Sequence, residues 1–237
     1  MPGFHLIMVS EIIIIHIITL PGKNMNIIDQ LSSQKGDRTQ ESNQLAAEKC
    51  LANPGLLSDI AQGLQSRDKN LAGDCAEVMT LAAASAPEKV FPFAIELLPL
   101  LDHKATRVRW EAAHALALVA DLVPEIVNQH LGKLHQQFKS DTSIIVRDYL
   151  MDVAARYAAK SPDAATRAWP MLQDALVLWE GRHAGHAVPG LEAVAAHHPG
   201  HINEIKSLCG PLLEHHKAVI RKSITSLLKK LESLKGA

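Results

Sequence analysis

The stretch DTSIIVRDYL, residues 141–150, decides the fold of this chain. Its pattern predicts that Asp141 ends one apolar helix, that a short polar turn follows, and that Val146 and Arg147 open the next helix. Similar stretches return at intervals of about 37 residues, and such a period is typical of repeat proteins built from stacked helical hairpins. One hairpin has too little apolar surface to close a core, so its neighbours must bury that surface.

The helix that follows Val108 shows the repeat most clearly. Its apolar residues Val108, Ala112, Ala115, Leu116 and Val119 recur at the spacing of one face of an α-helix. The equivalent positions of the other units carry one charged residue among apolar ones. They are Leu71, Cys75, Val78, Met79 and Ala82; Val146, Leu150, Val153, Ala154 and Tyr157; Ala184, Val188, Leu191, Glu192 and Ala195; and Ile220, Ile224, Leu227, Leu228 and Leu231.

Prolines mark the expected start of the first helix in four of the pairs. Pro87, Pro124, Pro162 and Pro199 are 37, 38 and 37 residues apart. Proline is tolerated in the first turn of a helix because the N–H at that position has no partner within the helix. Ser161 is a predicted N-cap. A lone helix near 42–52 is expected to precede the pairs 54–66 with 70–85, 88–101 with 105–122, 125–139 with 143–159, 163–179 with 183–197, and 201–215 with 217–234.

The pairs Val108-Arg109 and Val146-Arg147, each a few residues after an Asp, resemble the turns of HEAT and HEAT-like repeats, an armadillo-type family. The resemblance implies an all-α fold, a right-handed α-solenoid of about five HEAT-like helical hairpins whose second helices line the concave face. It also implies a hydrogen-bonded ladder of Asp and Arg side chains across the turns. The ladder residues expected from the resemblance are Asp102, Arg109, Asp141, Arg147 and Arg221.

The predicted repeat domain covers residues 42–237, most of the chain. Residues 25–41 are predicted to be a flexible linker, because the segment 32–44 is polar and rich in Ser and Gln.

Residues 1–24 do not match the rest of the chain. They are strongly apolar and β-branched, but Glu11 and His16 interrupt a run that is already short for a membrane span. Three interpretations stay open: a non-native segment or misplaced start, a membrane-associated or signal segment, and a packed strand or helix. We expect no membrane contact unless residues 4–20 are native and exposed.

Composition narrows the class of protein further. Of 237 residues, 47% are hydrophobic and only 4% are aromatic, which favours closely packed helices over sheets. The formal net charge is −1, without the strongly basic balance usual for nucleic-acid binding. Cys50, Cys75 and Cys209 are far apart and form no CxxC motif, so we interpret them as reduced core thiols of a cytoplasmic protein.

No nucleophile elbow, P-loop or Rossmann glycine pattern occurs in the sequence, and we expect no catalytic residue, cofactor or metal. The leading hypothesis is a non-enzymatic scaffold that binds an unidentified protein partner on its concave face. The alternative is a nucleic-acid-binding protein, or an enzyme of the HEAT-like DNA glycosylase type, that uses a basic stripe on that face. The basic residues expected to contact the partner are Arg107, Arg147, Arg156, Arg182, Arg221 and Lys222.

Histidines are concentrated between residues 183 and 216. His183 and His186 are three residues apart at a helix start, so both could reach one ligand. A metal site usually needs three or four converging ligands, and no cysteine or carboxylate stands at a matching spacing. We therefore interpret these histidines as surface or loop residues, and metal binding stays an open alternative.

Overall fold

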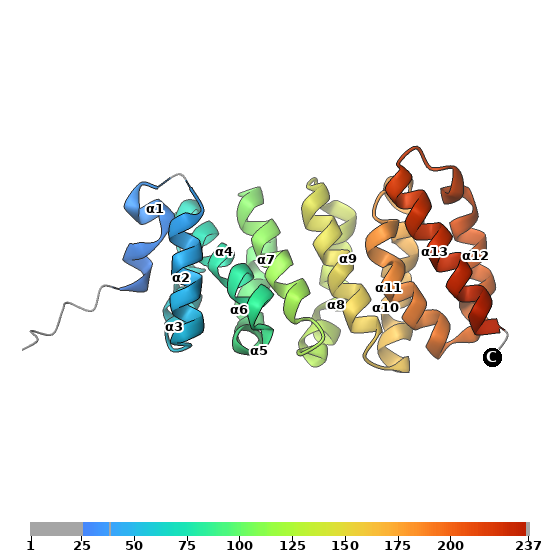
Figure 1. Ribbon diagram of the computed structural model, residues 1–237, viewed down its shortest axis with the longest axis horizontal. Helices are drawn as coiled ribbons and strands as arrows, with labels where there is room; N and C mark the ends of the chain where they lie inside the picture. Colours follow the sequence, from blue (N-terminus) through green and yellow to red (C-terminus); the bar gives the residue numbers. More distant parts are fainter. Residues whose placement is uncertain (1–25, 38, 236–237) are drawn as a thin grey trace, which may run out of the picture.

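The computed structural model describes residues 26–37 and 39–235. In this part of the chain every regular element is an α- or 3-10 helix. The units follow one another along the long axis, with the N-terminal helices at one end and α13 at the other, and form an α-solenoid (Figure 1). The predicted all-α repeat fold is confirmed.

The first helix is shorter than the second or broken into several pieces in the first, second and last units, whereas the first helices of the third and fourth units are longer than the second helices that follow them. The first helices are α3 (Leu56–Gly63); α5 (Pro87–Val90), η2 (Phe91–Phe93), α6 (Ala94–Leu97) and η3 (Leu98–Asp102); α8 (Pro124–Ser140); α10 (Pro162–Val177) with η4 (Leu178–Gly181); and η5 (Pro199–His201), α12 (Ile202–Cys209) and η6 (Gly210–Glu214). The second helices are α4 (Lys69–Ser85), α7 (Thr106–Val119), α9 (Ile144–Ala158), α11 (Ala184–His197) and α13 (Ala218–Lys235).

Each second helix packs against the second helix of the next unit, in the order α4, α7, α9, α11 and α13. We call the surface that these five helices share the second-helix face. Among the described helices, none is long and apolar enough to cross a bilayer.

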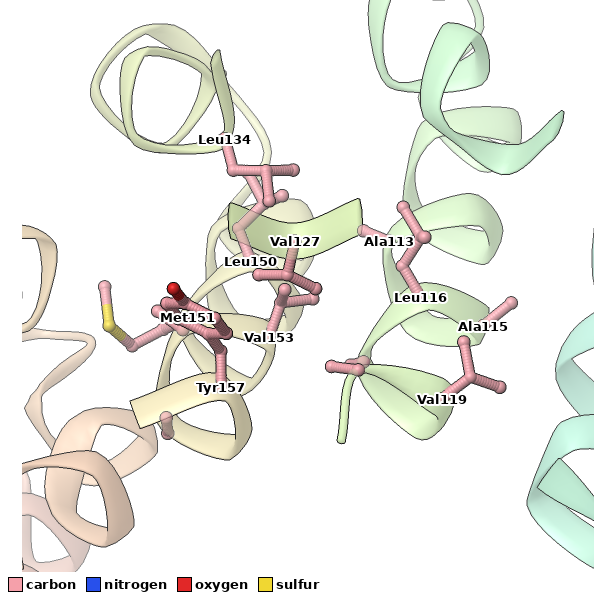
Figure 2. Packing of buried hydrophobic residues seen from close by; sticks show 14 of the residues in the cluster. Ala113, Ala115, Leu116, Val119, Val127, Leu134, Leu150, Met151, Val153 and Tyr157 are labelled. Atoms are coloured by element: carbon pink, nitrogen blue, oxygen red, sulfur yellow. The ribbon is translucent and has the colours of Figure 1, made fainter. Parts of the chain in front are cut away.

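The core lies between the two layers and runs through all the units. Val108 and Val146, at equivalent repeat positions, are completely buried, and Ile220 is almost so. Figure 2 shows this packing between neighbouring units, where Leu116 and Val119 of α7 and Leu150 of α9 belong to one cluster. The apolar column read from the sequence is therefore the column that packs.

The N-terminal segment differs from the predicted flexible linker. Residues 27–35 form η1 (Ile27–Gln30) and α1 (Ser32–Lys35), in which Ile27 is buried, and Leu31 between the two helices is fully buried. The backbone N–H of Ser33 donates to Asp74 of α4 at 2.6 Å. The linker prediction is wrong for these residues, because two apolar anchors and a long-range hydrogen bond hold a segment of polar composition.

The helix α2 (Glu41–Ala52) packs against α4 as the second helices pack on one another. Together with η1 and α1 it packs on the first unit, against α3 and α4. The predictions for residues 1–24 lie outside the described residues.

The N-cap at Ser161 gives a direct test of the helix starts. The Ser161 hydroxyl accepts the backbone N–H of Ala164 at 3.1 Å, and Pro162 occupies the first helical position of α10. We expect Ser161→Ala to lower the free energy of unfolding by about 1 kcal/mol, because it removes this cap, whereas Ser161→Asp should keep most of the stability. Urea denaturation measures both, and equal stability of the two variants would contradict this role.

Candidate binding surface

Four of the five turns that lead into the second helices contain the same type of hydrogen bond. The side chain at the start of the turn accepts the backbone N–H of the residue two positions later, which fixes the entry of the chain into the helix. The pairs and their distances are Ser66 with Asp68 (3.1 Å), His103 with Ala105 (3.0 Å), Asp141 with Ser143 (2.8 Å) and His215 with Lys217 (3.0 Å).

An arginine six residues after the start of the turn closes the same turn in three of the units. Its guanidinium Nη1 donates to the carbonyl oxygen of the residue that begins the turn. The pairs are Arg109 with His103 (2.9 Å), Arg147 with Asp141 (3.0 Å) and Arg221 with His215 (2.6 Å). These arginines satisfy carbonyl groups that a helix would otherwise leave without partners.

One ion pair links two of these turns. Arg109 of α7 donates through Nε to Asp141 Oδ2 at 2.7 Å and through Nη2 to Oδ1 at 3.1 Å. Asp102 does not take part in the ladder and instead forms an exposed ion pair with Lys133 at 2.6 Å. The prediction for Asp102 is wrong because the following residue, His103, occupies the equivalent turn position.

A tryptophan replaces the ladder carboxylate in the fourth unit. The Arg147 guanidinium carbon lies 3.8 Å from the centre of the Trp179 ring, a cation–π contact. Trp179, Glu180 and Gly181 all have positive φ, with values of 54°, 59° and 72°. Arg147 itself is buried, so the prediction that it contacts a partner is wrong: it supports the turn instead.

Arg107, the first residue of the predicted basic stripe, is neutralised by carboxylates of α4. Its guanidinium donates to Asp74 at 2.7 Å and to Glu77 at 2.6 Å, and both carboxylates are buried. Burial alone would raise the pKa of Asp74, but hydrogen bonds from Ser33 and Arg107 outweigh it and lower that pKa. Arg107 therefore adds no surplus of positive charge to this end of the face.

Histidine–aspartate pairs join α9 to α11. His183 is buried and its Nδ1 lies 2.6 Å from Asp148, while His186 is partly exposed and its Nδ1 lies 2.9 Å from Asp152. The hydrogen bond to Asp152 raises the pKa of His186. Within the described residues, no group of three or more His, Cys, Asp or Glu side chains is placed to hold a metal ion.

A cavity of about 410 Å³ opens on the second-helix face between α9, α11 and α13. Ile144 and Val219 lie at its edge with 40% and 67% of their surface exposed. Arg182 and Lys217 supply positive charge to the same cavity, which we call the α9–α13 cavity. Its lining residues are Ile144, Asp148, Asp152, Arg182, Gly185, His186, Pro189, Lys217, Val219, Ile220 and Ser223.

The predicted contact residues do not form one stripe along the face. Arg182 lines the α9–α13 cavity, and Arg221 and Lys222 line a neighbouring groove on α13. Arg156 is exposed and lies 3.5 Å from Asp121, at the other end of α9 from this cavity. Ile144 and Val219 could not be identified from the sequence, because each stands beside the apolar column of Val146 and Ile220 but outside it, and so gives no periodic signal of its own.

Comparison with known proteins supports the fold. No family model matches the chain, and no curated protein matches it. A designed armadillo repeat protein, YIII(Dq)4CqI, superposes with a TM-score of 0.64 at 18% identity, covering 86% of this chain and 98% of its own. A second designed armadillo repeat protein, solved in complex with the peptide (KR)4, gives 0.64 at 17% identity over the same fractions. An engineered protein gives 0.64 at 17% identity, covering 89% and 98%. The chain therefore has the HEAT/armadillo-like solenoid fold.

Proposed function

We propose that this protein is a non-enzymatic scaffold that holds an extended segment of a protein partner on its second-helix face. The observation that carries the proposal is the α9–α13 cavity, whose edge exposes the aliphatic side chains of Ile144 and Val219. Apolar side chains that remain exposed beside polar ones are a common mark of protein interaction sites.

The fold is suited to this task. Side chains from three successive second helices reach the same cavity, so a peptide that lies across the helices would contact all of them. One of the similar solved structures is a designed armadillo repeat protein in complex with a peptide. That neighbour supports peptide binding as one use of this architecture. That the present chain binds a segment of a protein partner is our proposal.

The burial and protonation of the cysteine side chains also fit a binding role. Cys50, Cys75 and Cys209 are buried. Burial raises the pKa of the Cys75 and Cys209 thiols to about 12, so both are protonated near neutral pH. Protonated, buried thiols are inert, whereas a reactive cysteine is a partly exposed thiolate.

Selection from a displayed library of random peptides, followed by affinity measurement, tests the proposal. We expect selected peptides to bind the full chain and to lose about tenfold or more in affinity to a variant with Ile144→Glu and Val219→Glu, because each glutamate places charge on an apolar contact. Ile95→Glu is the matched control, since Ile95 of α6 is also exposed (48%) but belongs to a first helix. Selection of no peptide, or equal affinity for the double variant and the wild type, would contradict the proposal.

A further inference from the structure

The acidic side chains of the second-helix face are already paired. Most of their partners are basic, histidine or amide side chains of neighbouring helices, whereas the Glu111 carboxylate accepts a hydrogen bond from the Trp110 indole of its own helix. The histidine partners neutralise Asp148 and Asp152 only when they are protonated. The contacts are Asp74 and Glu77 with Arg107 and Asn43, Asp148 with His183, Asp152 with His186, and Glu192 with Lys230.

Several cations of the same face have no such partner. Arg182, Lys217, Lys222 and Lys229 form no ion pair with any described carboxylate. Arg182 and Lys217 line the α9–α13 cavity, and the two α13 lysines line the adjacent groove of about 440 Å³. The C-terminal end of the face therefore presents four cations that no described carboxylate neutralises.

Aliphatic surface lies among these unpaired cations. Val219 is two residues from Lys217 and is 67% exposed, and Ile144 faces the same cavity from α9. A ligand that fits this arrangement needs carboxylates for the cations and branched apolar side chains for Val219 and Ile144. Charge-assisted hydrogen bonds would hold the carboxylates, and complementary charge would also speed the encounter.

We propose that the α9–α13 cavity and the adjacent groove bind a partner segment in which acidic and aliphatic side chains alternate. This inference rests on the proposed function and specifies the chemistry of its partner. Alternation suits an extended chain, because successive side chains then point to opposite sides and contact different walls of the cavity.

A protein segment fits the site better than a nucleic acid does. Single-stranded nucleic acids are usually held by aromatic side chains on which bases stack, along a strongly basic groove. No Trp, Tyr or Phe is among the described residues that line the cavity, and the formal net charge of the chain is −1. A phosphate backbone would also offer no apolar group for the exposed aliphatic residues to pack against.

Fluorescence anisotropy with the full chain and four labelled probes tests the inference. The probes are a short peptide of alternating Asp and Leu, the corresponding peptides of Lys and Leu and of Asp and Ser, and a single-stranded oligothymidylate. We expect the Asp–Leu peptide to bind at least about tenfold more tightly than each of the others. Tighter binding of the Lys–Leu peptide would overturn the inference and leave the proposed function standing.

The other outcomes are equally decisive. Equal or tighter binding of the oligothymidylate or the Asp–Ser peptide would show a general polyanion site and overturn the inference. If none of the probes binds while library-selected peptides do, the inference falls and the proposed function remains. If selection also yields no peptide, the proposed function falls with it.

Charge reversal tests whether the named cations are responsible. We expect Lys217→Glu to weaken the Asp–Leu peptide severalfold, and Lys217→Glu with Arg182→Glu to weaken it more than about tenfold and to strengthen the Lys–Leu peptide. Lys160→Glu is the matched control, because Lys160 is an exposed lysine after the opposite end of α9. Lys217 is exposed, so its single variant keeps the test valid if the double variant unfolds. Equal losses in the Lys160→Glu control and the Lys217 variants would overturn the inference.

Discussion

Replacing Asp141 by Ala is expected to lower the free energy of unfolding by about 3–5 kcal/mol, the usual cost of leaving one member of a buried ion pair alone. The Asp141 carboxylate is buried, and its partner Arg109 is only 12% exposed. The same carboxylate accepts the N–H of Ser143 and the amide of Gln137 at 2.8 and 2.9 Å. One substitution therefore disrupts an ion pair between units and the turn before α9.

Asp102→Ala is the matched control for this variant. Asp102 also has a basic partner, Lys133, but its side chain is 56% exposed. Exposed ion pairs contribute roughly 0–1 kcal/mol, so this loss should be small. Urea denaturation of both variants measures the difference, and similar losses for Asp141→Ala and Asp102→Ala would contradict the structural role of Asp141.

The contribution of Asp141 should also depend on pH. Burial alone would raise its pKa, but hydrogen bonds from Arg109, the Ser143 amide and Gln137 lower it below the ordinary value. A carboxyl whose pKa is lower in the folded state stabilises the protein above its unfolded pKa of about 3.9, and this stabilisation is lost as the pH falls through the folded pKa. The difference in stability between the wild type and Asp141→Ala should therefore be full at neutral pH and shrink in acid.

Gly190→Ala is expected to destabilise the protein by about 1–3 kcal/mol, because it overpacks a close contact between helices. A Cβ atom at Gly190 would lie 2.8 Å from the Ala155 Cα of α9 and 2.7 Å from a methyl group of Leu172. The backbone of α9 cannot move aside as the end of a flexible side chain can. This clash should outweigh the gain of about 1 kcal/mol that alanine normally gives over glycine in a helix.

Gly132→Ala separates the steric clash from the gain in helix propensity. Gly132 is an exposed residue of α8, and a Cβ atom added there would have no neighbour within 4 Å. Only the propensity gain remains, so the variant should be more stable by up to about 1 kcal/mol. Thermal and urea denaturation measure both variants. Stabilisation by Gly190→Ala would show that α9 and α11 are not packed as closely as the structure places them.

The parts of the fold that sequence alone predicted are those with a local cause. The apolar column of Val108 and Val146 follows from the period of the α-helix, and the helix starts at Pro124 and Pro162 follow from the geometry of proline. Each of these signals is complete within one unit. Their repetition at a nearly constant interval was enough to predict the stacking.

The charge pattern of the face could not be predicted in the same way. Arg107 and Asp74 are 33 residues apart, and only the stacking of α4 on α7 brings them together. The positions of the basic residues along the chain therefore predicted a basic stripe. In the structure Arg107 is neutralised by carboxylates of α4, and Arg147 is buried against Trp179. The linker was misjudged for a related reason, since Ser33 finds its hydrogen-bond partner, Asp74, 41 residues away.

Photo-crosslinking is the most direct test of the central claim, the binding of an extended partner segment at the α9–α13 cavity. An Asp–Leu peptide that carries photo-leucine in place of leucine would be irradiated with the full chain, and the attached residues would be identified by mass spectrometry. We predict that the crosslinks lie on Ile144, Pro189, Val219 and their neighbours on the second-helix face. Crosslinks concentrated on the first helices α8, α10 and α12 would contradict that claim.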